Sequence, residues 1–76
     1  MQENDFLKKF AFQFDETDPG LISLETNYKN LDEWSSLIVL SLMAMADEEY
    51  GVKLTPDDFK DNNTVGDIFN VIKAKM

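Results

Sequence analysis

The sequence contains no cysteine and no histidine. Without cysteine the chain can form neither disulfide bridges nor thiolate metal sites. Without histidine it lacks the commonest protein metal ligand and the usual general base at neutral pH. A Ser-His-Asp catalytic arrangement is therefore excluded within this chain, and we expect that the protein is not an enzyme.

Positive charge is also scarce, since 7 Lys and Arg residues stand against 15 Asp and Glu residues, for a net charge of −8. Nucleic acids and anionic membrane surfaces attract clusters of Lys and Arg, so we expect neither to be a partner. The charge favours basic protein partners that are attracted by electrostatic steering. The alternative is that it only keeps a small protein soluble.

Long hydrophobic runs are absent as well. The longest run, residues 37–46, is interrupted by Ser41 and is too short to span a bilayer. The N-terminus is acidic where a secretory signal would be basic, so we predict a soluble, cytoplasmic protein without a signal peptide. We expect the 76 residues to form one small domain, residues 1–76, that is a monomer.

The spacing of apolar residues predicts helices and no strands. Residues 3–14 carry one apolar stripe, with Phe6, Leu7, Phe10 and Phe14 at intervals of three and four. Residues 36–50 are apolar around most of a helix and stop at Gly51, a favourable C-terminal cap. Such a helix is either central in the fold or keeps an apolar face for a partner.

Two capping patterns predict two further helices. Thr55-Pro56-Asp57-Asp58 opens a short helix that ends near Asp61, and Thr64-Val65-Gly66-Asp67 opens a helix that continues to the C-terminus. The predicted fold is all-α, a small four-helix bundle with three longer helices and one short helix. Its first and second helices are joined by a long loop, residues 15–35, which we expect to pack across the helices because it carries six large apolar residues: Leu21, Ile22, Leu24, Tyr28, Leu31 and Trp34.

A serine hydroxyl, that of Ser36, stands at the junction between this loop and the second helix. Two interpretations are open. A serine at a helix N-terminus is common for capping alone. The apolar neighbours Trp34 and Leu37 could instead anchor the junction so that the hydroxyl is exposed near the positive end of the helix dipole. A phosphodiester on that oxygen would be stabilised there, and a presented serine without a catalytic partner indicates an attachment point.

From Leu31 to Ile72 the chain resembles the acyl carrier proteins. That family has an Asp-Ser-Leu motif at the start of its second helix, often preceded by Trp, and this chain has Trp34-Ser35-Ser36-Leu37. The spaced motifs Glu48-Glu49-Tyr50-Gly51 and Thr64-Val65-Gly66-Asp67 also match. The short motif is weakly specific alone, but the three in register are fairly specific.

The resemblance implies a four-helix carrier in which Ser36 bears 4′-phosphopantetheine derived from coenzyme A. The arm would carry acyl groups as thioesters and so supply the thiol that the chain lacks. The implied partners are a phosphopantetheinyl transferase and acyl-loading and acyl-processing enzymes with basic docking patches. The pathway would belong to fatty acid, polyketide or related biosynthesis.

The chain departs from the family where acids usually lie. Ser35 replaces the acid before the modified serine, and Ile38 and Ser41 stand where the second helix often carries further acids. We therefore predict a specialised carrier with a more apolar docking face. The residues assigned to docking are Trp34, Ser35, Leu37, Ile38, Leu40, Ser41, Asp47 and Glu48, with Asp32 and Glu33 as further parts of a displaced acidic patch. For Ile38 the alternative of a core residue stays open.

The alternative function is an acidic helical interaction module, a carrier relic without a prosthetic group. A dedicated metal site is not expected, because no acidic cluster has the alternating acids and the glycine of a calcium loop.

Overall fold

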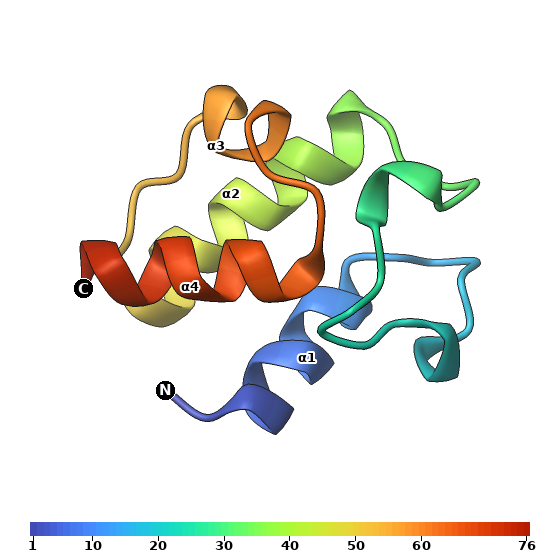
Figure 1. Cartoon of the computed structure of the whole chain (residues 1–76), viewed down its shortest axis with the longest axis horizontal. Helices are drawn as coiled ribbons and strands as arrows, with labels where there is room; N and C mark the ends of the chain where they lie inside the picture. The colour runs from blue at the N-terminus through green and yellow to red at the C-terminus, as the bar shows by residue number, and fades with distance from the viewer.

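The computed structural model describes all 76 residues. Helix α1 spans Glu3–Phe12, α2 spans Ser36–Tyr50, α3 spans Pro56–Lys60 and α4 spans Val65–Lys75. Two short 3-10 turns, η1 (Pro19–Leu21) and η2 (Tyr28–Asn30), lie in the connection between α1 and α2. In Figure 1 this connection occupies one end of the bundle, α2 crosses behind α4, and the short α3 lies at the upper edge. The predicted all-α fold, with three longer helices and one short, is confirmed.

The helix ends follow the local signals in the sequence. Gly51 adopts φ +66° as the left-handed cap of α2, a conformation that costs other residues about 1–2 kcal/mol. Thr55 and Thr64 form complete capping boxes at α3 and α4. Helix α1 ends at Phe12, two residues before the predicted end at Phe14, although the Phe14 side chain remains buried. No helix has the length and hydropathy that crossing a membrane would require.

The core is entirely apolar, with 17 buried residues and no buried polar or charged residue among them. Helix α1 contributes Phe6 and Phe10, which are completely buried, and α4 contributes Val65 and Ile72, which are also inaccessible. The aromatic rings of α1 pack against α4, since the ring centroids of Phe6 and Phe69 are 5.3 Å apart.

The long loop packs across the helices, as its apolar content predicts. Ile22 and Tyr28 are buried, and Leu24, Leu31 and Trp34 pack against the core. Leu21 is the exception, with 66% of its surface exposed at the end of η1. This loop is therefore a structural wall of the bundle and not a flexible linker.

The loop is held against the start of α4 by backbone hydrogen bonds. The Tyr28 N–H donates to the Asn63 carbonyl over 3.1 Å, and the Gly66 N–H donates to the Leu24 carbonyl over 2.8 Å. A Cβ at position 66 would lie 3.0 Å from that same carbonyl oxygen. Glycine is thus favoured there, because any side chain would require the loop backbone to shift.

Helix α3 is too short to be stable by itself and is held by contacts from the loop and from α4. The Tyr28 hydroxyl donates to the Phe59 carbonyl over 2.6 Å, and the Lys75 ammonium lies 2.8 Å from the Asp58 carboxylate. Burial, with a smaller contribution from the charge of Asp67, raises the pKa of Tyr28 well above its ordinary value, so the hydroxyl remains a donor. These contacts fix α3 against the loop and α4.

We predict that Tyr28→Phe destabilises the protein by about 1–3 kcal/mol, because it leaves the buried Phe59 carbonyl without its side-chain donor. The melting temperature should fall by about 4–8 °C per kcal/mol for a domain of this size. Thermal unfolding monitored by circular dichroism measures this change. Tyr50→Phe is the matched control, since the Tyr50 hydroxyl is buried without a partner. Equal effects of the two substitutions would contradict the assignment.

Candidate functional site

Two adjacent serines at the start of α2 have different environments. Ser35 is the N-cap, and its Oγ accepts a hydrogen bond from the Ile38 N–H over 3.4 Å. Ser36 is the first helical residue, it is exposed, and its hydroxyl forms no hydrogen bond within the chain. The capping role that was an alternative explanation for Ser36 is therefore taken by Ser35, which leaves the Ser36 hydroxyl accessible.

The junction before Ser36 is anchored by aromatic packing. The Trp34 ring lies 4.5 Å from that of Tyr28, 6.0 Å from Phe59 and 6.4 Å from Phe14, measured between centroids. Trp34 thereby contacts the loop, α3 and the segment that follows α1. Offset and tilted aromatic pairs of this kind are worth about 0.5–1.5 kcal/mol each beyond burial. The contacts hold the chain in place two residues before the exposed hydroxyl.

Glu33 provides a second anchor for the same junction. Its carboxylate accepts hydrogen bonds from the Asp15 N–H (2.7 Å), the Glu16 N–H (3.0 Å) and the Thr17 hydroxyl (2.8 Å). Desolvation, the largest single effect, raises the pKa of Glu33. The donors from Glu16, Thr17 and Asp15 together outweigh it, so the pKa lies below its ordinary value. The start of the connection that follows α1 is thus fastened to the residue that precedes Trp34.

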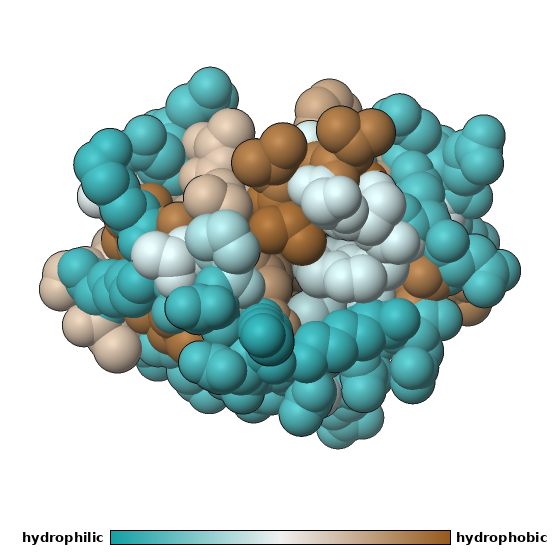
Figure 2. Space-filling model, turned by 90° about the horizontal axis from the view of Figure 1, so that it is seen from above, coloured by the Kyte–Doolittle hydropathy of each residue, from teal (hydrophilic) through white to brown (hydrophobic).

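A groove of about 400 Å³ opens beside Ser36 between α2 and α3. Its size falls within the range of small-molecule sites. The residues that line it are Lys29, Trp34, Ser36, Val39, Leu40, Pro56, Phe59 and Lys60. Figure 2 looks down on the side of the bundle where α3 lies, and hydrophobic atoms are exposed near the middle of that face within a hydrophilic surround. The arrangement places an apolar groove next to an exposed hydroxyl.

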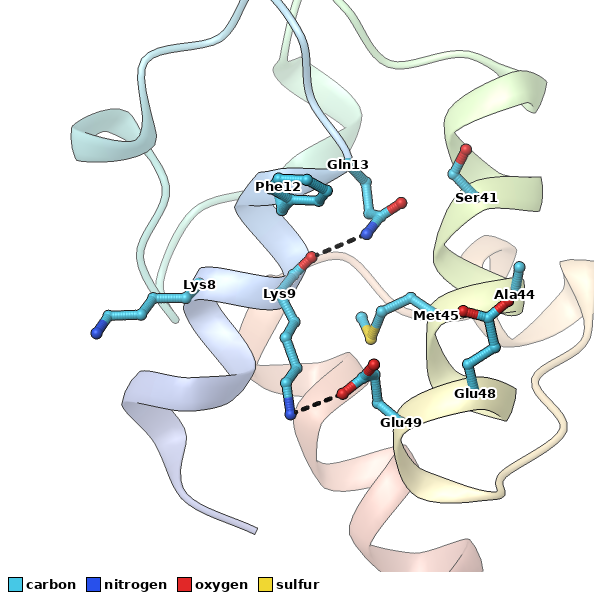
Figure 3. A pocket seen from close by; sticks show the side chains of 9 residues that line it. All are labelled: Lys8, Lys9, Phe12, Gln13, Ser41, Ala44, Met45, Glu48 and Glu49. Atoms are coloured by element: carbon cyan, nitrogen blue, oxygen red, sulfur yellow. Dashed lines mark hydrogen bonds and ion pairs between the residues drawn. The ribbon is translucent and has the colours of Figure 1, made fainter.

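A larger hollow of about 540 Å³ lies between α1 and α2 and does not include Ser36. Figure 3 shows that it is bridged by the ion pair of Lys9 and Glu49, whose charged atoms are 3.1 Å apart, and that Ser41 and Glu48 lie along its α2 side. The hydroxyl and this hollow therefore belong to different faces of α2.

The structure divides the residues that were assigned to docking. Leu37 and Leu40 are exposed, by 75% and 59%, and lie near Ser36 at the start of α2. Asp47 is further along the helix and pairs with Lys53 over 3.6 Å. Asp47 does not line the groove beside Ser36. Neither do Ser41 and Glu48, which line the other hollow.

Two assignments need correction. Ile38 is only 8% exposed, so its side chain belongs to the core and not to an outward docking face. The periodicity could not decide this because α2 is apolar around most of its circumference. The second is Glu33, which was assigned to an acidic docking patch. Its carboxylate instead accepts three hydrogen bonds from the loop. Asp32 is the acid that remains exposed at this junction.

Sequence comparison agrees with this geometry. Residues 13–72 match the family model described as the phosphopantetheine attachment site. Comparison with curated proteins gives no match. Because the family model covers most of the chain, the protein belongs to the phosphopantetheine-binding acyl carrier family.

The family carries covalent 4′-phosphopantetheine, and the match indicates no enzyme family. Carriers of this kind interact with the enzymes that modify them and with those that process their acyl groups. The residues at the start of α2 fit such a group. The N–H groups of Ser36 and Leu37 have no acceptor within the chain, and unpaired N–H groups at a helix N-terminus favour an anion such as a phosphodiester.

Several residues of the site had no clear signal in the sequence. Val39, Pro56 and Phe59 line the groove, but their apolar character alone fits a core equally well. The acceptor role of Glu33 depends on residues that lie 16 to 18 positions away in the chain. Only the fold brings these groups together.

We predict that Glu33→Gln destabilises the protein near neutral pH and flattens the acid side of its stability profile. The folded-state pKa of Glu33 lies below its ordinary value of 4.5, so its contribution to stability is present above that value and is lost as the pH falls below it. Denaturant unfolding at a series of pH values should show the gap between wild type and variant shrinking with acidity. Glu25→Gln, which removes no hydrogen-bonded carboxylate, is the control. A gap that stays constant with pH would contradict this role.

Proposed function

We propose that Ser36 is the attachment residue for 4′-phosphopantetheine and that the protein shuttles acyl groups between partner enzymes. The observation that carries this proposal is the division of labour at the start of α2, where Ser35 forms the cap and Ser36 is left exposed and unbonded. The family match supports the presence of an attachment site without naming its residue.

In this modification the chain contributes only the hydroxyl oxygen of Ser36. No carboxylate is hydrogen-bonded to Ser36 and the chain has no histidine, so the base that accepts the hydroxyl proton must come from the transferase. The bound arm supplies the thiol on which acyl groups are carried as thioesters. The unpaired N–H groups of Ser36 and Leu37 would stabilise the negative charge that the attachment brings.

The partner enzymes would meet a face that is apolar and short of acids near the serine. Leu37 and Leu40 are exposed there, while Ser35 lacks the carboxylate that this position has in most of the family. We infer a specialised carrier of fatty acid, polyketide or related biosynthesis, whose partners bind partly through apolar contacts. This role is consistent with the soluble, cytoplasmic protein that the composition predicts.

The second candidate is an acidic interaction module that is never modified. The exposed Leu37 and Leu40 favour it, because an apolar patch on a helix can bind a partner without any prosthetic group. The two candidates differ in whether the Ser36 oxygen is needed.

We predict that incubation with coenzyme A and a broad-specificity phosphopantetheinyl transferase adds one phosphopantetheinyl group, seen by intact-mass spectrometry. Ser36→Ala should abolish the addition and leave stability nearly unchanged. Ser35→Ala should keep the addition but destabilise α2 by about 1 kcal/mol through loss of the cap. No addition with any transferase, including those of the source organism, would favour the unmodified module.

We further predict that Ser35→Asp raises kcat/KM for modification by a transferase with a basic docking surface. Asp caps a helix as well as Ser does, so the fold should be retained while an acid returns beside Ser36. Initial rates at several salt concentrations measure the effect, which should shrink as salt screens the added charge. Ser35→Asn, which caps without charge, is the control. An equal gain in the Asn variant would mean that charge is not the cause.

A further inference from the structure

The groove beside Ser36 has a feature that its apolar walls do not explain, namely two lysines on its rim. The chain has seven basic residues, all lysines. Three of them pair with carboxylates: Lys9 with Glu49, Lys53 with Asp47, and Lys75 with Asp58. Lys29 and Lys60 pair with none, and both line the groove.

The Lys29 ammonium is held in place without being neutralised. It donates to the Lys60 carbonyl over 2.8 Å and to the Asn63 side-chain oxygen over 3.1 Å. Both acceptors are uncharged, so the positive charge remains available. The same hydrogen bond brings the backbone of Lys60 next to the Lys29 head group, which gathers both residues at one end of α3.

These positive charges stand out against the rest of the molecule. With a net charge of −8, the protein as a whole repels an anion. Two lysines without a carboxylate partner place positive charge at this groove, and the attraction of an anion to a solvent-exposed site of this kind is modest and screened by salt. Their aliphatic stems extend the apolar wall while the ammonium groups stay in water.

We propose that this groove accepts an acyl group that ends in a carboxylate. The alkyl part would lie against Trp34, Leu40 and Phe59, and the carboxylate would meet the ammonium groups of Lys60 and Lys29. The inference rests on the proposed function, since the acyl group reaches the groove on an arm attached to Ser36, which lines it. The carrier would then bear acyl groups that end in a carboxylate, and residues outside the attachment site would bind them.

The test uses the holo-protein loaded with either an octanoyl or a suberoyl group, which differ only in a terminal methyl or carboxylate. Trp34 is the sole tryptophan and lines the groove, so its emission, together with the amide resonances of Phe59 and Lys60, reports occupancy. Lys60→Gln should lower the bound-to-free ratio of the suberoyl chain by about two- to five-fold, the range of an exposed ion pair, and leave the octanoyl ratio unchanged. High salt should have the same selective effect.

Lys73→Gln is the matched control, because Lys73 also lies in the last turn of a helix, has no carboxylate partner and does not line the groove. If Lys60→Gln lowered the bound-to-free ratio equally for the octanoyl and suberoyl groups, the Lys60 ammonium would be acting on the phosphodiester of the arm. That result would overturn the proposal. So would loading without any change at Trp34 or the groove amides. If neither acyl group loads onto Ser36, the proposed function is overturned, and this inference with it.

Discussion

The packing of Trp34 is the constraint on which the rest of the site depends. Its ring contacts Tyr28 in the loop, Phe59 in α3 and Phe14 after α1, so one side chain joins three parts of the molecule. The hydrogen bond from Tyr28 to the Phe59 carbonyl completes this cluster. Because α3 has only five residues, these contacts and not its own helical propensity determine where it lies. They also form one wall of the groove beside Ser36.

The start of α2 is thus held in place by neighbouring contacts, while the Ser36 side chain on it is exposed. Ser35 accepts a hydrogen bond from one N–H at the helix start, that of Ile38, while Glu33 fastens the preceding turn to the loop. The Ser36 hydroxyl forms no hydrogen bond within the chain, which suits the attachment proposed above. In the function proposed above, a chain without histidine or cysteine would rely on the attached group and on partner enzymes for its chemistry.

Most of the secondary structure could be predicted from local signals. The capping boxes at Thr55 and Thr64 and the left-handed Gly51 lie where their sequence patterns place them, because caps depend on neighbouring residues. The loop was correctly expected to pack, although Leu21 does not. The assignment of Ile38 to docking failed, since a helix that is apolar around most of its circumference carries no periodic signal of which side faces outward.

The sequence by itself determined the class of fold, the starts of the last three helices, and the presence of a serine at the start of α2, because these follow from periodicity and capping between near neighbours. Only the tertiary structure decided that Glu33 is an anchor and not part of an acidic patch, and that Lys29 and Lys60 share one groove with Ser36. Those relations join residues that are far apart in the chain. Their contacts depend on how the loop and α3 pack, which no local pattern specifies.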